Sequence, residues 1–347
     1  MLTFQPARAD GLRVAFFHTE LARDGPGLLL RDIAAADPQV LALRRVIDAA
    51  AADVLVLAGV DYDAEGRALA ALNAGLAEPY PALLPLAGNT GIDTGIDLDG
   101  DGRLGSAGDR QAFGRFPGQS GLAVLSRLPI RHAGVRSLND LLWRDLPGSL
   151  IVDVAGQVGA AAQGSAVQRL SSGGHWIVPL DAPGGRVLSL MAFHASPPVF
   201  DGPEDRNGRR NADEIRLWQL LLDGAMATPP PDPPFILLGA ANADPSDGDG
   251  QRDAIRGLLA DPRLQDPAPR SVGGDLAGGE AQSGDPALDT ADWGEPVPGN
   301  LRVDYVLPSA TLTVTGSGVL WPPLGDPLAQ AVLDASRHRL VWVDIAW

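Results

Sequence analysis

The sequence predicts a single α/β domain. Short apolar segments of strand length alternate with amphipathic helical segments along most of the 347 residues. Two segments have the composition of loops, the Pro-rich run at 228–234 and the Gly/Asp-rich run at 271–300, and each leads directly into another buried strand. No internal repeat divides the sequence. We therefore expect one domain over residues 1–347, with residues 1–11 as a leader or tail and 271–300 as a long loop.

The first elements follow from short local signals. Leu12–Phe17 is an apolar run that predicts a strand ending at His18. A helix is expected to begin at Asp37-Pro38, since Asp is a favourable N-cap and Pro is favoured in the first helical turn. Apolar residues at 40, 43 and 47 give this helix a buried face. Val54–Leu57 predicts a buried strand, and an Ala-rich helix is expected near 64–76.

The remaining elements continue this alternation. Residues 211–222 predict a helix, because Ile215, Trp218 and Leu222 share one side of it. Five further apolar runs predict strands at 121–126, 187–193, 235–238, 303–307 and 340–345.

Composition excludes several kinds of site and partner. The chain has no Cys, which excludes disulfides and thiolate metal sites. Lysine is also absent, so all 27 cationic side chains are Arg, as expected of a GC-rich genome. A net charge of −16 disfavours broad contact with a phosphate backbone, so nucleic acid is not an expected partner. No apolar run is long enough to span a membrane, and the first residues lack the apolar segment of a signal peptide.

An acidic run at 97–109 has the spacing of a calcium-binding loop. Carboxylates occupy alternate positions, a Gly stands sixth, and a backbone carbonyl is available at the seventh. The twelfth position is Gly108 instead of the Glu of an EF-hand, and no helices flank the run. The alternative is a solvated acidic turn, but carboxylates this close repel one another unless a cation lies between them. We predict a structural Ca²⁺ held by Asp97, Asp99, Asp101, Arg103 and Asp109.

Six longer motifs occur in one order along the chain from residue 12 onward. They are RDGPGLLLRD at 23–32, FPGQSGLAVLSR at 116–127, PPVFDGPEDRNGRR at 197–210, NADPSDGDG at 242–250, NLRVDYVLP at 300–308 and SRHRLVWVD at 336–344. Together they resemble one bacterial branch of the endonuclease/exonuclease/phosphatase superfamily. The resemblance implies a four-layer α/β sandwich, with two mostly antiparallel sheets face to face and helices outside. It also implies phosphoester hydrolysis with a divalent cation, usually Mg²⁺, held by carboxylates.

The acidic positions of that site are altered in this chain. The first strand of such enzymes usually ends in Phe-Asn-Thr, which here is Phe17-His18-Thr19. The Glu that is the family's principal metal ligand corresponds to Gly59. The Asp at the attacking water corresponds to Ala240, and the metal-contacting Asp of Ser-Asp-His corresponds to Arg337. Mg²⁺ is therefore not expected at the former active site, since Gly59 and Ala240 offer no side-chain oxygen.

The positions that contact phosphate in the family are retained. They are His194, Asn242, Asp304 and His338, and the resemblance pairs Asp304 with His338. We predict a catalytically degenerate member whose pocket has become an anion site, because Arg binds phosphate, sulfate or carboxylate well. This site is expected to contain His18, His194, Asn242, Arg337 and His338.

Three alternatives stay open. Drift of an unused site also accounts for the small residues Gly59 and Ala240. His18, His194 and His338 are a possible three-His site for Zn²⁺, which would make the chain an active phosphoesterase or nuclease. An unknown protein partner is the third alternative.

Other polar residues have weaker claims to a role in the site. Asp61 and Asp63 follow Gly59 as candidates for a displaced metal ligand, and Asp61, two residues beyond Gly59, is the better placed because strand alternation aims it to the same side. His175 is interpreted as packing and His132 as surface. Relatives with such an Asp-rich loop are often exported, so the resemblance implies a secreted or periplasmic protein.

Overall fold

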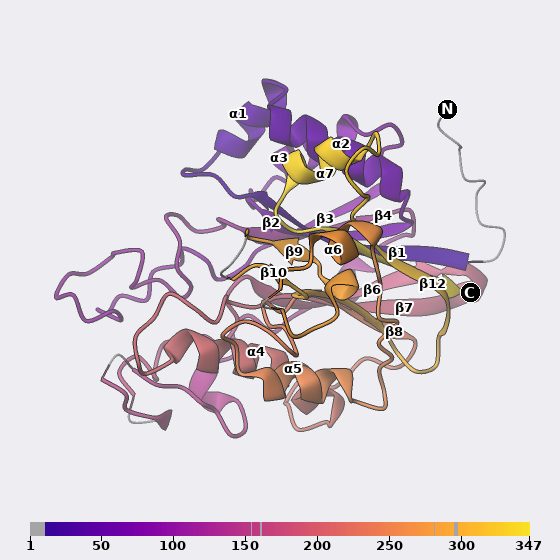
Figure 1. Cartoon of the computed structure of the whole chain (residues 1–347). Helices are drawn as coiled ribbons and strands as arrows, with labels where there is room; N and C mark the ends of the chain where they lie inside the picture. Colours follow the sequence, from indigo (N-terminus) through magenta and orange to yellow (C-terminus); the bar gives the residue numbers. More distant parts are fainter. Residues whose placement is uncertain (1–10, 154, 160–161, 281, 295–297) are drawn as a thin grey trace.

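The computed structural model describes residues 11–153, 155–159, 162–280, 282–294 and 298–347, and most of the predicted leader at 1–11 lies outside this range. Two sheets form the centre of the molecule (Figure 1). The six-stranded sheet has the order β12 (Thr313–Leu320), β13 (Leu340–Ala346), β1 (Gly11–Leu21), β2 (Val54–Val60), β4 (Gly121–Ser126) and β3 (Ala82–Leu86). The five-stranded sheet has the order β11 (Asp304–Pro308), β8 (Phe235–Ala240), β7 (Arg186–His194), β6 (Gly174–Ala182) and β5 (Arg136–Ser137).

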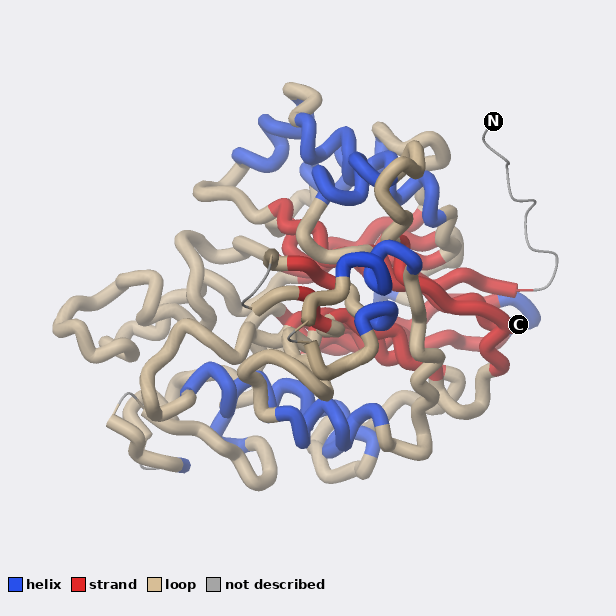
Figure 2. The backbone as a smooth tube through the Cα atoms, in the orientation of Figure 1, coloured by secondary structure: helices blue, strands red, loops and turns tan. Residues whose placement is uncertain are grey.

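Helices cover the outer face of each sheet, as the blue segments of Figure 2 show. The six-stranded sheet packs against α1 (Leu28–Ala34), α2 (Pro38–Ala50), α3 (Arg67–Ala74) and α7 (Ala329–Ala335). The five-stranded sheet packs against α4 (Arg206–Leu222) and α5 (Arg252–Leu259). Short 3₁₀ turns lie at η1 (His132–Gly134), η2 (Trp143–Asp145), η4 (Pro183–Gly185) and η5 (Pro286–Leu288). No helix among the described residues combines the length and apolar composition needed to cross a bilayer.

Three apolar clusters fill the interfaces between these four layers. In β1, Val14 and Phe16 point into the cluster between the two sheets, while Ala15 and Phe17 point into the cluster beneath the helices. Both faces of this strand are buried, which explains why its sequence is apolar throughout. The predicted four-layer sandwich is confirmed. Its sheets are mostly antiparallel, with parallel pairs only at β1–β2 and β7–β8 among the strands described.

The segment predicted as a long loop at 271–300 contains regular structure, so that prediction is corrected. It forms α6 (Val272–Ala277), η5 and the two-stranded ribbon of β9 (Ala291–Asp292) and β10 (Asn300–Leu301), while residues 281 and 295–297 of the segment lie outside the described range. The Ser271 side chain caps α6 by accepting from Gly274 N–H. A Cβ on Gly273 would lie 2.3 Å from the Trp321 ring, so a glycine that looks like a loop residue is there for close packing.

Candidate functional site

The predicted site residues lie at one edge of the paired sheets. His18 is opposite Ala58 in the parallel β1–β2 pair, and Gly59 follows in β2. In the other sheet His194 is opposite Ala240 at the ends of the parallel β7–β8 pair, and Asp304 begins β11 opposite Ala240. Parallel strands end at the same edge, so residues far apart in sequence come together there.

Three histidine rings form a cluster at this edge. The His18 ring stacks on the His338 ring with centroids 4.2 Å apart and planes 27° apart. The His194 ring meets the His18 ring edge-on at 4.8 Å and 78°. Trp293, in the segment predicted to be loop, packs edge-on against His338 at 5.2 Å. No local sequence pattern indicates a role for this Trp in the site.

His338 and Asp304 form the pair that the resemblance implied. The Nδ1 atom of His338 lies 2.7 Å from Oδ2 of Asp304, and both residues are buried. Burial raises the pKa of the Asp304 carboxyl, while the charge and hydrogen bond of His338 oppose that rise. The second carboxylate oxygen, Oδ1, has no hydrogen-bond partner among the described residues.

The other two imidazoles are held in their neutral form. Burial lowers the pKa of His194 to about 4, with His338 and His175 adding to the effect. Burial also lowers the pKa of His18 well below its usual value, reinforced by His338, His194 and Arg337. The Nδ1 atoms of His18 and His194 are buried and have no hydrogen-bond partner within the described part of the chain. At neutral pH the cluster is therefore polar but uncharged at these two rings.

The His18 ring occupies the space that a side chain at position 59 would need. A Cβ built on Gly59 lies 2.9 Å from Cε1 and 3.2 Å from Nε2 of His18. The backbone of Gly59 has φ of +71°, a left-handed conformation that L side chains rarely adopt. A carboxylate side chain at 59 would therefore require the His18 ring to move and a strained backbone at 59.

Asp61 and Asp304 are carboxylates near the altered positions, and each has at least one hydrogen-bonded oxygen. Asp61 is buried and accepts hydrogen bonds from the backbone N–H groups of Arg23 (2.9 Å) and Ser120 (3.1 Å). Asp304 is paired with His338, and Ala240 offers only a methyl group. These donors do not fit Mg²⁺, which requires several oxygen ligands in octahedral geometry.

Arg337 does not join the histidine cluster as a free cation. Its side chain is 61% exposed and forms an ion pair with Glu20. Nε donates to Oε1 of Glu20 at 2.8 Å, and the Arg337 backbone N–H donates to Oε2 at 2.7 Å. Glu20 thus neutralises the charge that the sequence analysis assigned to an anion. The sequence offered no way to foresee this pair, since its members lie 317 positions apart.

Asn242 lies at the same edge in the left-handed conformation, with φ of +51°. Its side-chain amide donates to the Ala195 carbonyl at 2.8 Å, and so ties the end of β8 to the residue after His194.

A buried carboxylate that the sequence analysis missed holds His194 in place. Glu214 of α4 accepts from the backbone N–H and hydroxyl of Ser172 at 2.6 Å, and from the same groups of Ser196 at 2.7 Å. These serines flank the His194 strand end, where Gly173 N–H also donates to the His194 carbonyl at 3.1 Å.

The two remaining histidines are not members of the three-ring cluster. The interpretation of His175 as packing fits its position, since it is fully buried and hydrogen-bonded to Ser171 (2.8 Å) and the Glu214 carbonyl (3.1 Å). His132 is exposed.

The Asp-rich loop gathers three of its carboxylates. Oxygens of Asp97, Asp99 and Asp109 lie within 4.8 Å of one another. The carboxylate of Asp101 is outside this group and instead accepts from the backbone N–H of Arg103 at 2.8 Å. A Cβ on Gly108 would lie 2.0 Å from a carboxylate oxygen of Asp99, which explains why a closing Glu is absent at the twelfth position.

Asp109 is the most enclosed of the three. It is fully buried, and it accepts from the N–H groups of Leu98 (2.8 Å) and Ser106 (3.0 Å). Burial acts to raise the pKa of its carboxyl, but these hydrogen bonds outweigh it and lower the pKa below the usual value.

Comparisons with known proteins agree with this architecture. A family model described as "Endonuclease/Exonuclease/phosphatase family" matches residues 18–338. An endonuclease/exonuclease/phosphatase from Beutenbergia cavernae is similar in structure, with TM-score 0.53 and 21% identity over 97% of this chain and 72% of that one. A family protein from Leptotrichia buccalis gives TM-score 0.52 and 15% identity, covering 97% and 100% of the two chains.

The catalytic domain of human Nocturnin, solved with a bound sulfate anion, gives TM-score 0.51 and 16% identity over 98% of this chain and 94% of that one. At such identities the solved structures support the fold alone. The sequence matches no curated protein. On the family match over residues 18–338, the chain belongs to the endonuclease/exonuclease/phosphatase family.

Proposed function

We propose that this chain is a catalytically degenerate member of its family, and that its former active site binds a small oxyanion such as phosphate or sulfate. The absence of a catalytic metal is supported by Gly59, where a side chain would meet the His18 ring and a left-handed backbone. The family's principal metal ligand is a Glu at that position, and here an uncharged ring takes its space. The site therefore lacks the carboxylate ligands that metal-dependent hydrolysis requires.

The histidine cluster supports the second half. A buried ring nitrogen without a partner is unfavourable by about 1–3 kcal/mol, and an oxyanion bonded to the protonated ring would remove that penalty. The bound negative charge would also favour protonation of His18 and His194, so anion binding and proton uptake are coupled. Arg337 is exposed and paired with Glu20. We therefore propose that the imidazoles, more than the Arg337 guanidinium, bind the anion.

Titration of phosphate and sulfate by calorimetry at several pH values tests this site. We expect affinity to rise as the pH falls toward 4, the depressed pKa of His194 in the unliganded site. His194→Asn should abolish that rise. The matched control His132→Asn, at an exposed histidine, should leave it unchanged. Absence of binding, or equal binding by His194→Asn, would refute the anion site and favour drift or a protein partner.

A hydrolysis assay tests the loss of catalysis. A generic phosphodiester and a phosphomonoester should show no turnover with Mg²⁺, Mn²⁺, Ca²⁺ or Zn²⁺. Chelator-sensitive turnover that His338→Ala destroys would instead support the alternative, an active phosphoesterase or nuclease with a His-based metal. Among the described residues, the group whose ligand atoms lie close enough together to hold a metal is Asp97, Asp99 and Asp109 and not the three histidines, which argues against that alternative.

We further propose that the Asp-rich loop binds Ca²⁺ in a structural role. The proximity of the Asp97, Asp99 and Asp109 oxygens supports this, since such a group repels itself without a cation. Ca²⁺ should raise the melting temperature, and Asp99→Asn should remove the effect. Glu65→Gln removes the same charge at an exposed residue outside the loop and serves as the control. Unchanged melting on addition of Ca²⁺ would exclude the site.

A further inference from the structure

The Arg337 guanidinium beside the histidine cluster already holds a carboxylate of the same chain. Glu20 follows His18 by two residues, and Arg337 directly precedes His338. Three N–H groups of Arg337 bind the Glu20 carboxylate: Nε and Nη2 donate to Oε1, and the backbone N–H donates to Oε2 at 2.7 Å. Both carboxylate oxygens are therefore bound by one residue, in the manner in which a guanidinium binds a carboxylate or phosphate ligand.

The backbone of β1 is irregular where it carries Glu20. The register between β1 and β2 shifts between His18 and Leu21, and Glu20 within this shift has φ of +52°. L side chains rarely adopt this left-handed conformation, which is concentrated at binding and switch positions and persists only where other contacts hold it. The bonds from Arg337 are such contacts, so the strained backbone points to a role for the Glu20 side chain.

Ser336 joins this ion pair to the histidine cluster. Its hydroxyl donates to the His18 carbonyl at 2.8 Å and accepts from the His338 N–H at 3.0 Å. The same hydroxyl lies 3.2 Å from Oε2 of Glu20. After burial and the neighbouring rings, the charge of Arg337 also contributes to the lowered pKa of His18. An anion bound to the imidazoles would therefore interact with both members of the ion pair.

The pair stays charged and is open to solvent on the arginine side. Burial acts to raise the pKa of the Glu20 carboxyl, but the hydrogen bonds and charge of Arg337 outweigh it and lower the pKa below its usual value. The Glu20 side chain is 21% exposed and that of Arg337 is 61% exposed. An incoming anion therefore reaches the guanidinium from solvent, but it meets a cation already neutralised by Glu20.

We propose that Glu20 is an internal ligand, which withholds the Arg337 donors from the oxyanion bound at the histidine cluster and thereby limits its affinity. This inference rests on the proposed function, because it concerns the anion held by the imidazoles. In the native chain the imidazoles bind the anion and Glu20 retains Arg337. Without the Glu20 carboxylate, the guanidinium and backbone N–H of Arg337 bind the anion as well.

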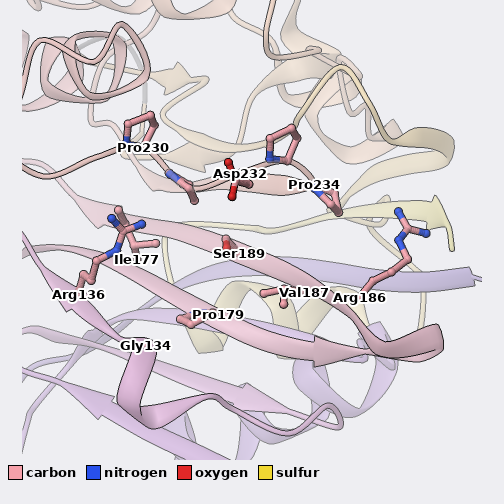
Figure 3. Close-up of a pocket in the computed structure, with 12 residues that line it drawn as sticks. Gly134, Arg136, Ile177, Pro179, Arg186, Val187, Ser189, Pro230, Asp232 and Pro234 are labelled. Atoms are coloured by element: carbon pink, nitrogen blue, oxygen red, sulfur yellow. The ribbon is translucent and has the colours of Figure 1, made fainter.

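Calorimetric titration with inorganic phosphate at a fixed, mildly acidic pH compares charge-matched variants. Glu20→Gln should bind phosphate about tenfold more tightly than the native chain, because the anion gains charge-assisted contacts with Arg337. Combining Glu20→Gln with Arg337→Gln restores the native net charge and should restore the native affinity. Combining Glu20→Gln with Arg136→Gln gives the same net charge but should keep the gain, because Arg136 lines a separate cavity between the five-stranded sheet and residues 230–234 (Figure 3).

Asp292→Asn separates the ion pair from the local electric field. The Asp292 N–H donates to the Arg337 carbonyl at 3.0 Å, whereas its carboxylate lies 3.7 Å from Nη2 of Arg339. This substitution removes the same charge beside the same turn and leaves Glu20 on Arg337, so it should give a clearly smaller gain than Glu20→Gln. An equal gain in Asp292→Asn, or loss of the gain with Arg136→Gln, would overturn the proposal.

Acetate tests the carboxylate site without relying on the histidines. In Glu20→Ala the Arg337 donors lose their carboxylate, so acetate should bind there and raise the melting temperature. The native chain and the double variant Glu20→Ala with Arg337→Gln should not respond, and an equal response in all three would overturn the proposal.

The two titrations together distinguish this inference from the proposed function. Phosphate binding that is present in the native chain and unchanged in Glu20→Gln would overturn the role of Glu20 and leave the histidine anion site standing. If phosphate binds neither chain while acetate stabilises Glu20→Ala alone, the histidine anion site is refuted and Glu20 is retained as the ligand of Arg337.

Discussion

The depressed pKa of His194 makes a quantitative prediction about stability in mild acid. In the unfolded chain a histidine titrates near 6.5, whereas burial lowers the pKa of folded His194 to about 4. Between these values the unfolded state takes up the proton first, so acid favours unfolding. The stability that neutral His194 contributes to the folded state is fully present above about pH 6.5 and is lost as the pH falls toward 4. At pH 5 the loss is about 2 kcal/mol.

Urea denaturation from pH 7.5 down to pH 5 measures this loss. Other groups titrate in the same window, including Asp289, whose pKa burial raises to about 7 and whose contribution has the opposite sign. The test is therefore the difference between the native chain and His194→Asn, which should shrink by about 2 kcal/mol over this range. His132→Asn, at an exposed ring, should keep the native slope. Parallel pH profiles for the native chain and His194→Asn would refute the assignment.

Phosphate provides an independent arm of the same experiment. If the anion binds the protonated cluster, phosphate should offset part of the acid loss in the native chain and none of it in His194→Asn. An equal effect of phosphate on both chains would mean that the stability change does not come from this cluster.

Four other substitutions test the remaining contacts. Gly59→Glu should reduce the free energy of unfolding by about 1–3 kcal/mol through overpacking, and His18→Ala in the same chain should recover part of it; equal losses in both backgrounds would contradict the clash. Asp304→Asn should lose about 1.5–3 kcal/mol with its charge-assisted hydrogen bond, measured by urea denaturation, and a neutral result would refute that bond's role. Arg337→Ala should change stability by less than about 1 kcal/mol, and a larger loss would show that its ion pair is not merely a surface contact. Gly108→Ala should abolish any Ca²⁺-dependent rise in melting temperature, because the new methyl group displaces the neighbouring Asp carboxylate; an unchanged rise would argue against that geometry.

Elements specified by local signals were predicted well. α2 begins at Pro38 as expected, because the Asp37 side chain caps it by accepting from the N–H groups of Gln39 and Val40. α4 begins at Arg206, five residues before the predicted start. Its first turns carry polar residues whose partners are distant in sequence, such as Arg210, whose Nε donates to the Leu170 carbonyl at 2.9 Å. Such a buried polar face lacks the apolar periodicity on which the prediction relied.

In the candidate site, too, some features could be predicted from the sequence and others depend on distant contacts. The resemblance implied that His18, His194 and His338 converge, and their rings do lie together. The charge states of the site residues could not be predicted from the sequence. The pairing of Arg337 with Glu20 and the neutral state of the imidazoles depend on burial and on contacts across hundreds of residues.

The packing of the His18 ring against Gly59 also bears on which substitutions could restore a metal ligand at position 59. A Glu introduced first at 59 meets the imidazole and a left-handed backbone, while a smaller residue introduced first at 18 leaves a void and still no ligand. Neither single change recovers metal binding, and Ala240 and Arg337 would have to change as well. Under the proposed function, a return to metal binding would therefore need coordinated changes at 18 and 59 and not a single substitution.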